Sequence, residues 1–92
     1  MYIVLIYDIN IDDNGAKASR NIFKICKKYL THVQKSVFEG DIILGLLQKL
    51  KIEVSRHIRK DKDSVIVFRS RDERWMQKEF LGKKDDKTSN FF

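Results

Sequence analysis

The sequence predicts an α+β domain in which two helices cover one face of a four-stranded antiparallel sheet. Three observations lead to this prediction. Residues 2–7 and 64–68 are apolar runs rich in branched side chains, which is typical of strands buried on both faces. Residues 15–31 and 41–60 repeat apolar side chains at three- and four-residue steps, as amphipathic helices do. At 92 residues, the chain has the length of a single domain.

The first strand ends at a lone carboxylate, Asp8, and a polar turn follows over residues 10–15. Removing an ionised carboxylate from water costs on the order of several kcal/mol unless a hydrogen bond, a basic group or a cation compensates it. Two interpretations of Asp8 are open from the residue types alone: it caps the turn, or it serves a function.

The first helix is expected over residues 15–31, with Cys26 on its apolar stripe and basic side chains on the opposite side. The basic residues follow the helical period, so they are expected to lie in one row on the solvent side. This row, the basic face, consists of Lys17, Arg20, Lys24, Lys27 and Lys28.

Residues 32–39 alternate in character with a period of two, which predicts a second strand. Gly40 and Asp41 close this strand and begin the second helix, whose apolar stripe extends from Ile43 to Ile58. The helix ends in a basic segment that contains Arg56, Arg59 and Lys60.

The third strand is expected over residues 64–68 and the fourth over residues 74–81, where apolar and polar side chains alternate. A short helix over residues 73–81 is the alternative for the last segment. We interpret the elements as the order βαββαβ of the ferredoxin-like sandwich.

Two helices cover only one face of such a sheet, yet the first and third strands are apolar on both faces. The uncovered face is therefore expected to pack against a second copy of the chain, giving a homodimer. In that pair the two Asp8 side chains would meet near the two-fold axis.

Gly82 ends the predicted domain, which therefore covers residues 1–82 and leaves a polar tail over residues 83–92. The tail ends in Phe91 and Phe92. These two rings either fray with the terminus or dock on a partner.

Lysine and arginine outnumber aspartate and glutamate by 19 to 13, which gives a formal net charge of +6. A basic surface attracts polyanions, and nucleic acid is the commonest polyanion in a cell. The alternative is that the basic residues are only the solvated sides of helices.

A single cysteine excludes an internal disulfide and a four-thiolate metal site within one chain, and it fits a reducing cytoplasm. No apolar run is long enough for a signal peptide or a membrane span, so no membrane partner is expected.

The spacing of several residue types excludes further kinds of chemistry. The four glycines are too far apart to form a phosphate-binding loop. His32 and His57 lack the spacing of helical metal sites. Cys26 is expected on the buried face of the first helix and Ser36 has no obvious partner, so neither is identified as a nucleophile with an adjacent base.

Phosphodiester hydrolysis assisted by a divalent cation is the chemistry that remains, because carboxylate oxygens are suitable ligands for Mg²⁺ or Mn²⁺. A single chain provides only one Asp8 carboxylate as a metal ligand, whereas a two-fold dimer would provide two such carboxylates. Asp12 and Asp13 are further candidates from the loop, although paired acids in a turn are more often turn formers.

Four segments together resemble the CRISPR-associated protein two family. The segments are Tyr7-Asp8-Ile9, Phe23-x-x-Cys26-x-x-Tyr29-Leu30, Val33-Gln34-x-Ser36-Val37-Phe38-Glu39-Gly40 and Asp63-Ser64-Val65-x-Val67-Phe68. The resemblance covers nearly the whole domain, and the Gln-x-Ser-Val-Phe-Glu segment is its most specific part. It implies a ferredoxin-like homodimer, in agreement with the fold expected from the elements.

The resemblance also implies that Asp8 is the family's metal-binding aspartate, which holds Mg²⁺ for endonucleolytic cleavage of RNA or double-stranded DNA. It implies a second role in spacer acquisition, in which the dimer lies between two dimers of the CRISPR integrase and supports duplex DNA. Two features depart from the family pattern. His32 stands where members often have arginine, and Lys17 and Arg20 follow a longer acidic loop.

Three functional hypotheses follow. A metal-dependent endonuclease would use Asp8, with Lys17, Arg20 and His32 positioning the phosphate. A non-catalytic scaffold would bind duplex DNA through basic side chains and contact the integrase through the tail. A toxin-like RNA interferase would share this size and topology. The side chains expected to bind the nucleic acid are Lys17, Arg20, Lys24, Lys27, Lys28, Arg56, Arg59 and Lys60.

Overall fold

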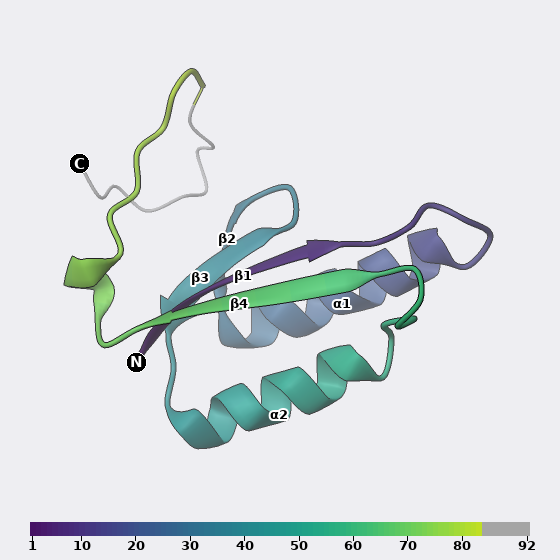
Figure 1. The fold of residues 1–92 in the computed structure, drawn as a ribbon, viewed down its shortest axis with the longest axis horizontal. Helices are drawn as coiled ribbons and strands as arrows, with labels where there is room; N and C mark the ends of the chain where they lie inside the picture. Colours follow the sequence, from purple (N-terminus) through teal and green to yellow (C-terminus); the bar gives the residue numbers. More distant parts are fainter. Residues whose placement is uncertain (84–92) are drawn as a thin grey trace.

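A computed structural model describes residues 1–83 of the chain, so the predicted docking of Phe91 and Phe92 lies outside the described residues (Figure 1). The elements in chain order are β1 (Tyr2–Asp8), α1 (Gly15–Tyr29), β2 (Thr31–Gln34), β3 (Val37–Asp41), α2 (Leu44–Ser55), β4 (Ser64–Ser70) and a 3₁₀ helix, η1 (Glu73–Trp75). The sheet has the order β2-β3-β1-β4 with antiparallel neighbours throughout. The predicted βαββαβ sandwich is therefore confirmed.

The segment predicted as one strand over residues 32–39 is a hairpin of β2 and β3, so this prediction was wrong in its boundaries. The chain reverses at Lys35, which adopts a positive φ of 42°. A turn without glycine or asparagine at that position leaves no signal in the sequence. Two strands, β2 and β3, therefore lie between α1 and α2 in the chain. The predicted ranges had only one strand at this place.

The second helix is shorter than predicted, since α2 covers Leu44–Ser55 and not residues 41–60. Residues 56–63 form turns that lead into β4. The basic segment at the end of the predicted helix therefore lies in a loop, where its side chains do not share one helix face.

The predicted fourth strand over residues 74–81 does not form, and neither does a helix over the whole segment. Met76, Lys78 and Phe80 are half-buried while their neighbours are exposed. Residues 76–80 line a cavity together with Val4, Val33 and Val37 of the sheet. The alternation that resembled a strand thus comes from an irregular segment lying against the sheet.

The core lies between the sheet and the two helices, which cover the same face (Figure 1). Alternate residues of β1 point toward it, because successive side chains of a strand face opposite sides. The core side chains with the lowest exposure are Ile3, Leu5, Ile22, Cys26, Phe38, Leu47 and Leu50. Cys26 is buried, as its place on the apolar stripe predicts.

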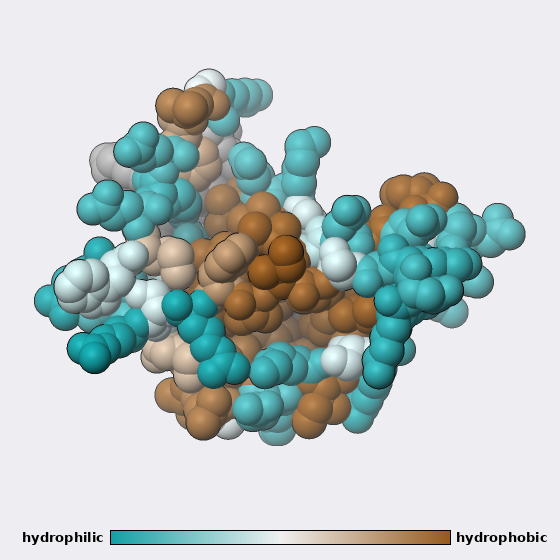
Figure 2. All heavy atoms as spheres, viewed as in Figure 1, coloured by the Kyte–Doolittle hydropathy of each residue, from teal (hydrophilic) through white to brown (hydrophobic). Residues whose placement is uncertain are grey.

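The opposite face of the sheet, which we call the open face, carries Val4 and Ile6 of β1 beside Phe68 and Ile66 of β4. Ile66 is 51% exposed and Phe68 is 50% exposed. Figure 2 shows hydrophobic side chains gathered over β4 in the middle of the view. The expectation that a second copy covers this face stays a prediction.

Gly15 at the start of α1 offers a test of how closely the β1–α1 loop packs. A Cβ atom at this position would lie 1.9 Å from the carbonyl oxygen of Asn10, so the loop backbone would have to move. We expect Gly15→Ala to lower the free energy of unfolding by about 1–3 kcal/mol, measured by urea denaturation.

The matched control is Gly45→Ala in α2, where an added Cβ meets nothing within 4 Å. Alanine is the better helix former, so this variant should be as stable as the parent or more stable by up to about 1 kcal/mol. Equal destabilisation by both substitutions would contradict the close approach at Gly15.

Candidate functional site

Asp8 is the last residue of β1 and its side chain is exposed. β1 pairs with β3 on one edge and with β4 on the other, where Asp8 lies opposite Ser64. Tyr7 and Ile9 are buried in the core on the helix side. Strand alternation therefore places Asp8 on the open face, at the end of a strand that is fixed along both edges.

The loop that follows Asp8 is held to the α2–β4 turn by a charged network centred on Arg59. The guanidinium donates from Nε to Asp63 Oδ2 at 2.9 Å, from Nη2 to Asp63 Oδ1 at 3.1 Å and from Nη2 to the Asn10 carbonyl at 3.0 Å. Nη1 donates to the Asp12 carboxylate, which also accepts from Lys62 Nζ at 3.1 Å. Asp63 in turn accepts from the backbone N–H of Asn10 at 2.9 Å. Two loops distant in sequence are thus joined beside Asp8.

This network fixes the ionisation of its members. Hydrogen bonding from Arg59 lowers the pKa of the Asp63 carboxyl well below its ordinary value. Hydrogen bonds from Arg59 and then Lys62 lower the pKa of Asp12 in the same way. Asp63 and Asp12 raise the pKa of Arg59 in return. Asp12, one of the two extra carboxylates considered as metal ligands, is therefore engaged by two basic side chains.

Residues 1–83 of a single chain do not form a complete metal site. Among residues 1–83, no three side chains of His, Cys, Asp or Glu lie close enough together to hold an ion. Asp8 alone offers two carboxylate oxygens, whereas Mg²⁺ requires six ligands, of which several are usually waters. Residues 1–83 of one chain therefore leave an ion at Asp8 in need of further donors.

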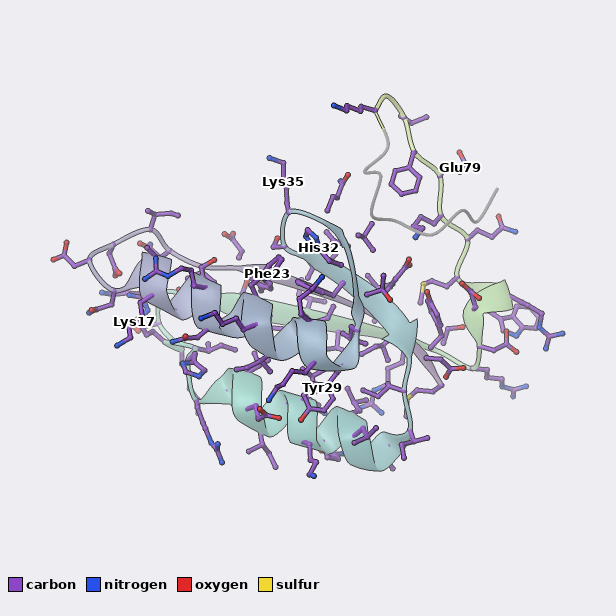
Figure 3. All side chains as sticks on the ribbon, turned by 180° about the vertical axis from the view of Figure 1, so that it is seen from behind. Lys17, Phe23, Tyr29, His32, Lys35 and Glu79 are labelled. Atoms are coloured by element: carbon purple, nitrogen blue, oxygen red, sulfur yellow. The ribbon has the colours of Figure 1, made fainter. Side chains whose placement is uncertain are left out.

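The basic face is exposed along α1, as predicted: Lys17, Arg20, Lys24, Lys27 and Lys28 all lie on the surface. Lys28 differs from the others, because its ammonium pairs with Glu53 Oε1 of α2 at 2.6 Å. The Tyr29 hydroxyl also donates to Glu53. Figure 3 shows Lys17 near the start of α1 and Tyr29 near its end, beside α2.

His32 lies on β2 and packs in an aromatic cluster. Its ring is 4.8 Å from the ring of Phe23 and 4.9 Å from that of Phe38, measured between centroids. Nε2 lies 2.8 Å from the Lys35 carbonyl oxygen, so the ring also closes the hairpin turn (Figure 3). These contacts give His32 a structural role in the hairpin. Its predicted role in positioning a substrate phosphate stays a prediction.

The structure separates the predicted site residues into three groups. Asp8 stands at the end of β1, and the basic face extends away from it along α1. Arg56 and Lys60 are exposed near the end of α2, while Arg59 is held within the charged network. Asp63, the buried partner of Arg59, was not among the predicted site residues, and the two lie four residues apart after the end of α2, where helical spacing gives no signal.

No helix among the described residues is both long and apolar enough to cross a membrane.

Comparisons with known proteins agree on one family. The family model described as CRISPR associated protein Cas2 matches residues 1–78. A curated relative from Fusobacterium nucleatum, named CRISPR-associated endoribonuclease Cas2, is 56% identical over 99% of this chain and 86% of its own length. A relative from Moorella thermoacetica, named CRISPR-associated endoribonuclease Cas2 2, is 46% identical over 97% of this chain and 99% of its own length.

A solved structure agrees with the sequence comparisons. The crystal structure of Streptococcus pyogenes Cas2 at pH 6.5 superimposes with a TM-score of 0.80 at 28% identity. The match covers 89% of this chain and all of the other. The same arrangement of sheet and helices is therefore found in a crystal structure.

The lowered pKa of Asp63 gives the charged network a testable pH dependence. A carboxyl whose folded-state pKa is lowered stabilises the fold above its unfolded pKa of about 3.9, and this contribution is lost as pH falls through the folded value. Asp63→Asn should therefore be less stable than the parent at pH 7, and the difference should shrink below about pH 4. Urea denaturation from pH 7 to pH 2 measures it.

Asp61→Asn is the matched control, since Asp61 is an exposed carboxylate in the same turn. It should change stability by no more than about 0.5 kcal/mol at any of these pH values. A stability difference for Asp63→Asn that is constant over the whole pH range would contradict the role of the ionised carboxylate.

Proposed function

The chain belongs to the Cas2 family of CRISPR-associated proteins, and on this basis we propose that it is a nuclease that cleaves RNA or double-stranded DNA and takes part in spacer acquisition. The observation that carries the proposal is the placement of Asp8. It is an exposed carboxylate at the end of a strand paired on both edges, and the relatives are named endoribonucleases. A nuclease needs such a group in a fixed position beside the backbone of its substrate.

The proposed reaction needs two chains. A homodimer formed through the open face would bring together two Asp8 carboxylates, which would hold Mg²⁺ or Mn²⁺ through hard oxygen ligands. When bound, the ion would activate water and offset the charge that develops on the phosphate. Lys17 and Arg20 lie in the first two turns of α1, directly after the loop that follows Asp8, where they would hold the phosphate.

A scaffold function is the second candidate, and the length of the basic face supports it. From Lys17 to Lys28 the helix rises by roughly 17 Å, which corresponds to about five base pairs of duplex. Contacts of this extent exceed what cleavage of one bond requires. We therefore propose that the same face, with Arg56 and Lys60, binds duplex DNA while the protein contacts the CRISPR integrase. Both functions fit a cytoplasmic protein with one reduced cysteine.

Asp8→Asn tests the nuclease proposal. The substitution removes the charge of an exposed side chain with little change in its shape, so the fold should be retained. We expect cleavage of a labelled single-stranded RNA to fall by at least about 100-fold, because an essential carboxylate is lost. Addition of EDTA to the parent protein should have a comparable effect.

Asp61→Asn serves as the control for this experiment, because it makes the same chemical change at an exposed turn position. It should cleave as the parent does. Equal cleavage by Asp8→Asn and the parent would assign the activity to a contaminant and remove the nuclease proposal.

The binding role of the basic face predicts a graded effect of its lysines. Lys24 and Lys27 have no ion pair among the described residues, whereas Lys28 pairs with Glu53. Lys24→Ala and Lys27→Ala should each weaken duplex DNA binding and lower the slope of log K against log salt by about 0.9.

Lys28→Ala should weaken binding less, because Glu53 already offsets its charge. Fluorescence anisotropy at several salt concentrations measures all three variants. Binding that is insensitive to Lys24→Ala and Lys27→Ala would exclude α1 as the nucleic-acid surface.

A further inference from the structure

Arg59 was expected to bind nucleic acid, but its contacts indicate a different task. Its four side-chain hydrogen bonds use Nε, Nη1 and Nη2, so at most one of the five guanidinium N–H groups is left. The acceptors are two carboxylates and one backbone carbonyl. A phosphate would have to compete with Asp12 and Asp63 for donors that they already hold.

The burial of Arg59 and Asp63 also disfavours contact between Arg59 and a phosphate. The side chain of Asp63 is fully buried and that of Arg59 is 23% exposed. If Arg59 turned outward to a phosphate, it would leave a buried carboxylate without its basic partner, which is strongly unfavourable. The fold therefore keeps the guanidinium inside the network.

The network anchors the loop that follows Asp8 and the start of the neighbouring strand β4. Asn10, two residues after Asp8, is held at both backbone groups: its N–H donates to Asp63 and its carbonyl accepts from Arg59. On β4, Ser64 lies opposite Asp8 and directly follows Asp63. A Cβ at Gly15 would lie only 1.9 Å from the oxygen of the same Asn10 carbonyl, so the start of α1 packs directly against this anchored group.

We propose that Arg59 is a positioning residue for the reaction centre: it holds the Asp8 carboxylate and the first turn of α1 in register and does not contact the nucleic acid. This inference rests on the proposed nuclease function. It assigns to Arg59 an effect on the rate of the chemical step. Substrate affinity should not depend on it.

The experiment compares Arg59→Met with the parent in three measurements on a labelled single-stranded RNA of mixed sequence. The single-turnover cleavage rate should fall by about 10- to 100-fold, since a misplacement of about 1 Å at a catalytic group has an effect of this size. The Kd should stay within about twofold and its salt slope should not change, because no phosphate contact is lost. Hydrogen exchange at the amides of residues 9–13 should become faster while exchange in the middle of α2 does not.

Asp12→Asn distinguishes a positioning role of Arg59 from a phosphate-binding role, because the two roles predict different changes in cleavage rate and RNA affinity. If Arg59 only positions, this substitution loosens the network and lowers the cleavage rate. If Arg59 binds phosphate, the substitution frees the guanidinium and tightens RNA binding beyond the tightening caused by Asp61→Asn, which makes the same change in charge. Arg59→Lys should recover only part of the rate, because one ammonium cannot bridge two carboxylates and a carbonyl.

Melting curves establish that each variant is folded at the assay temperature. If Arg59→Met is not folded there, Arg59→Lys and Asp12→Asn carry the test, each with the result stated for it above. Weaker RNA binding and a lower salt slope at an unchanged cleavage rate would overturn the inference, as would a variant that matches the parent in all three measurements. Full activity of Asp8→Asn would instead remove the nuclease proposal, so the two failures are distinguishable.

Discussion

The pairing of β1 along both edges is the constraint on which the rest of the structure depends. A strand in this position satisfies its backbone hydrogen bonds with β3 and β4, and it can then bury Ile3, Leu5 and Tyr7 against the helices. Asp8, the last residue of β1, is therefore attached to a strand that is held in place by its pairing and its burial. Asp8 is exposed to solvent, yet its backbone belongs to a strand of the sheet and lies opposite Ser64 of β4.

Much of this arrangement could be predicted from the sequence. The apolar runs identified β1 and β4, the helical period identified α1, and Asp8 stood out as a charge after a buried strand. The hairpin could not be predicted, because its reversal depends on Lys35 in a conformation that lysine rarely adopts. Of residues 74–81, residues 76–80 border a cavity together with the sheet, and a pattern with period two does not distinguish this packing from strand pairing.

The charge of a residue in the sequence did not predict whether its side chain is available for binding. Arg59 and Lys28 count equally with Lys24 in the net charge, yet the structure commits Arg59 to Asp63 and Asp12 and pairs Lys28 with Glu53. The pairing of Arg59 with Asp63 spans four residues after the end of α2, where the spacing rule for helix faces does not apply. The pairing with Asp12 spans 47 residues and follows only from the fold. A basic residue can therefore be assigned to a binding surface only after its intramolecular partners are known.

The open face links the proposed dimer to the proposed chemistry. Asp8 shares this face with Ile66 and Phe68, so covering the apolar side chains with a second copy would also bring carboxylates of like charge together. Burial of apolar surface favours that association, whereas repulsion and desolvation of the two Asp8 groups oppose it. A cation between the carboxylates would remove the opposition. In the proposed assembly, dimerisation and metal binding must therefore strengthen each other by the same factor, since linkage between two binding equilibria is reciprocal.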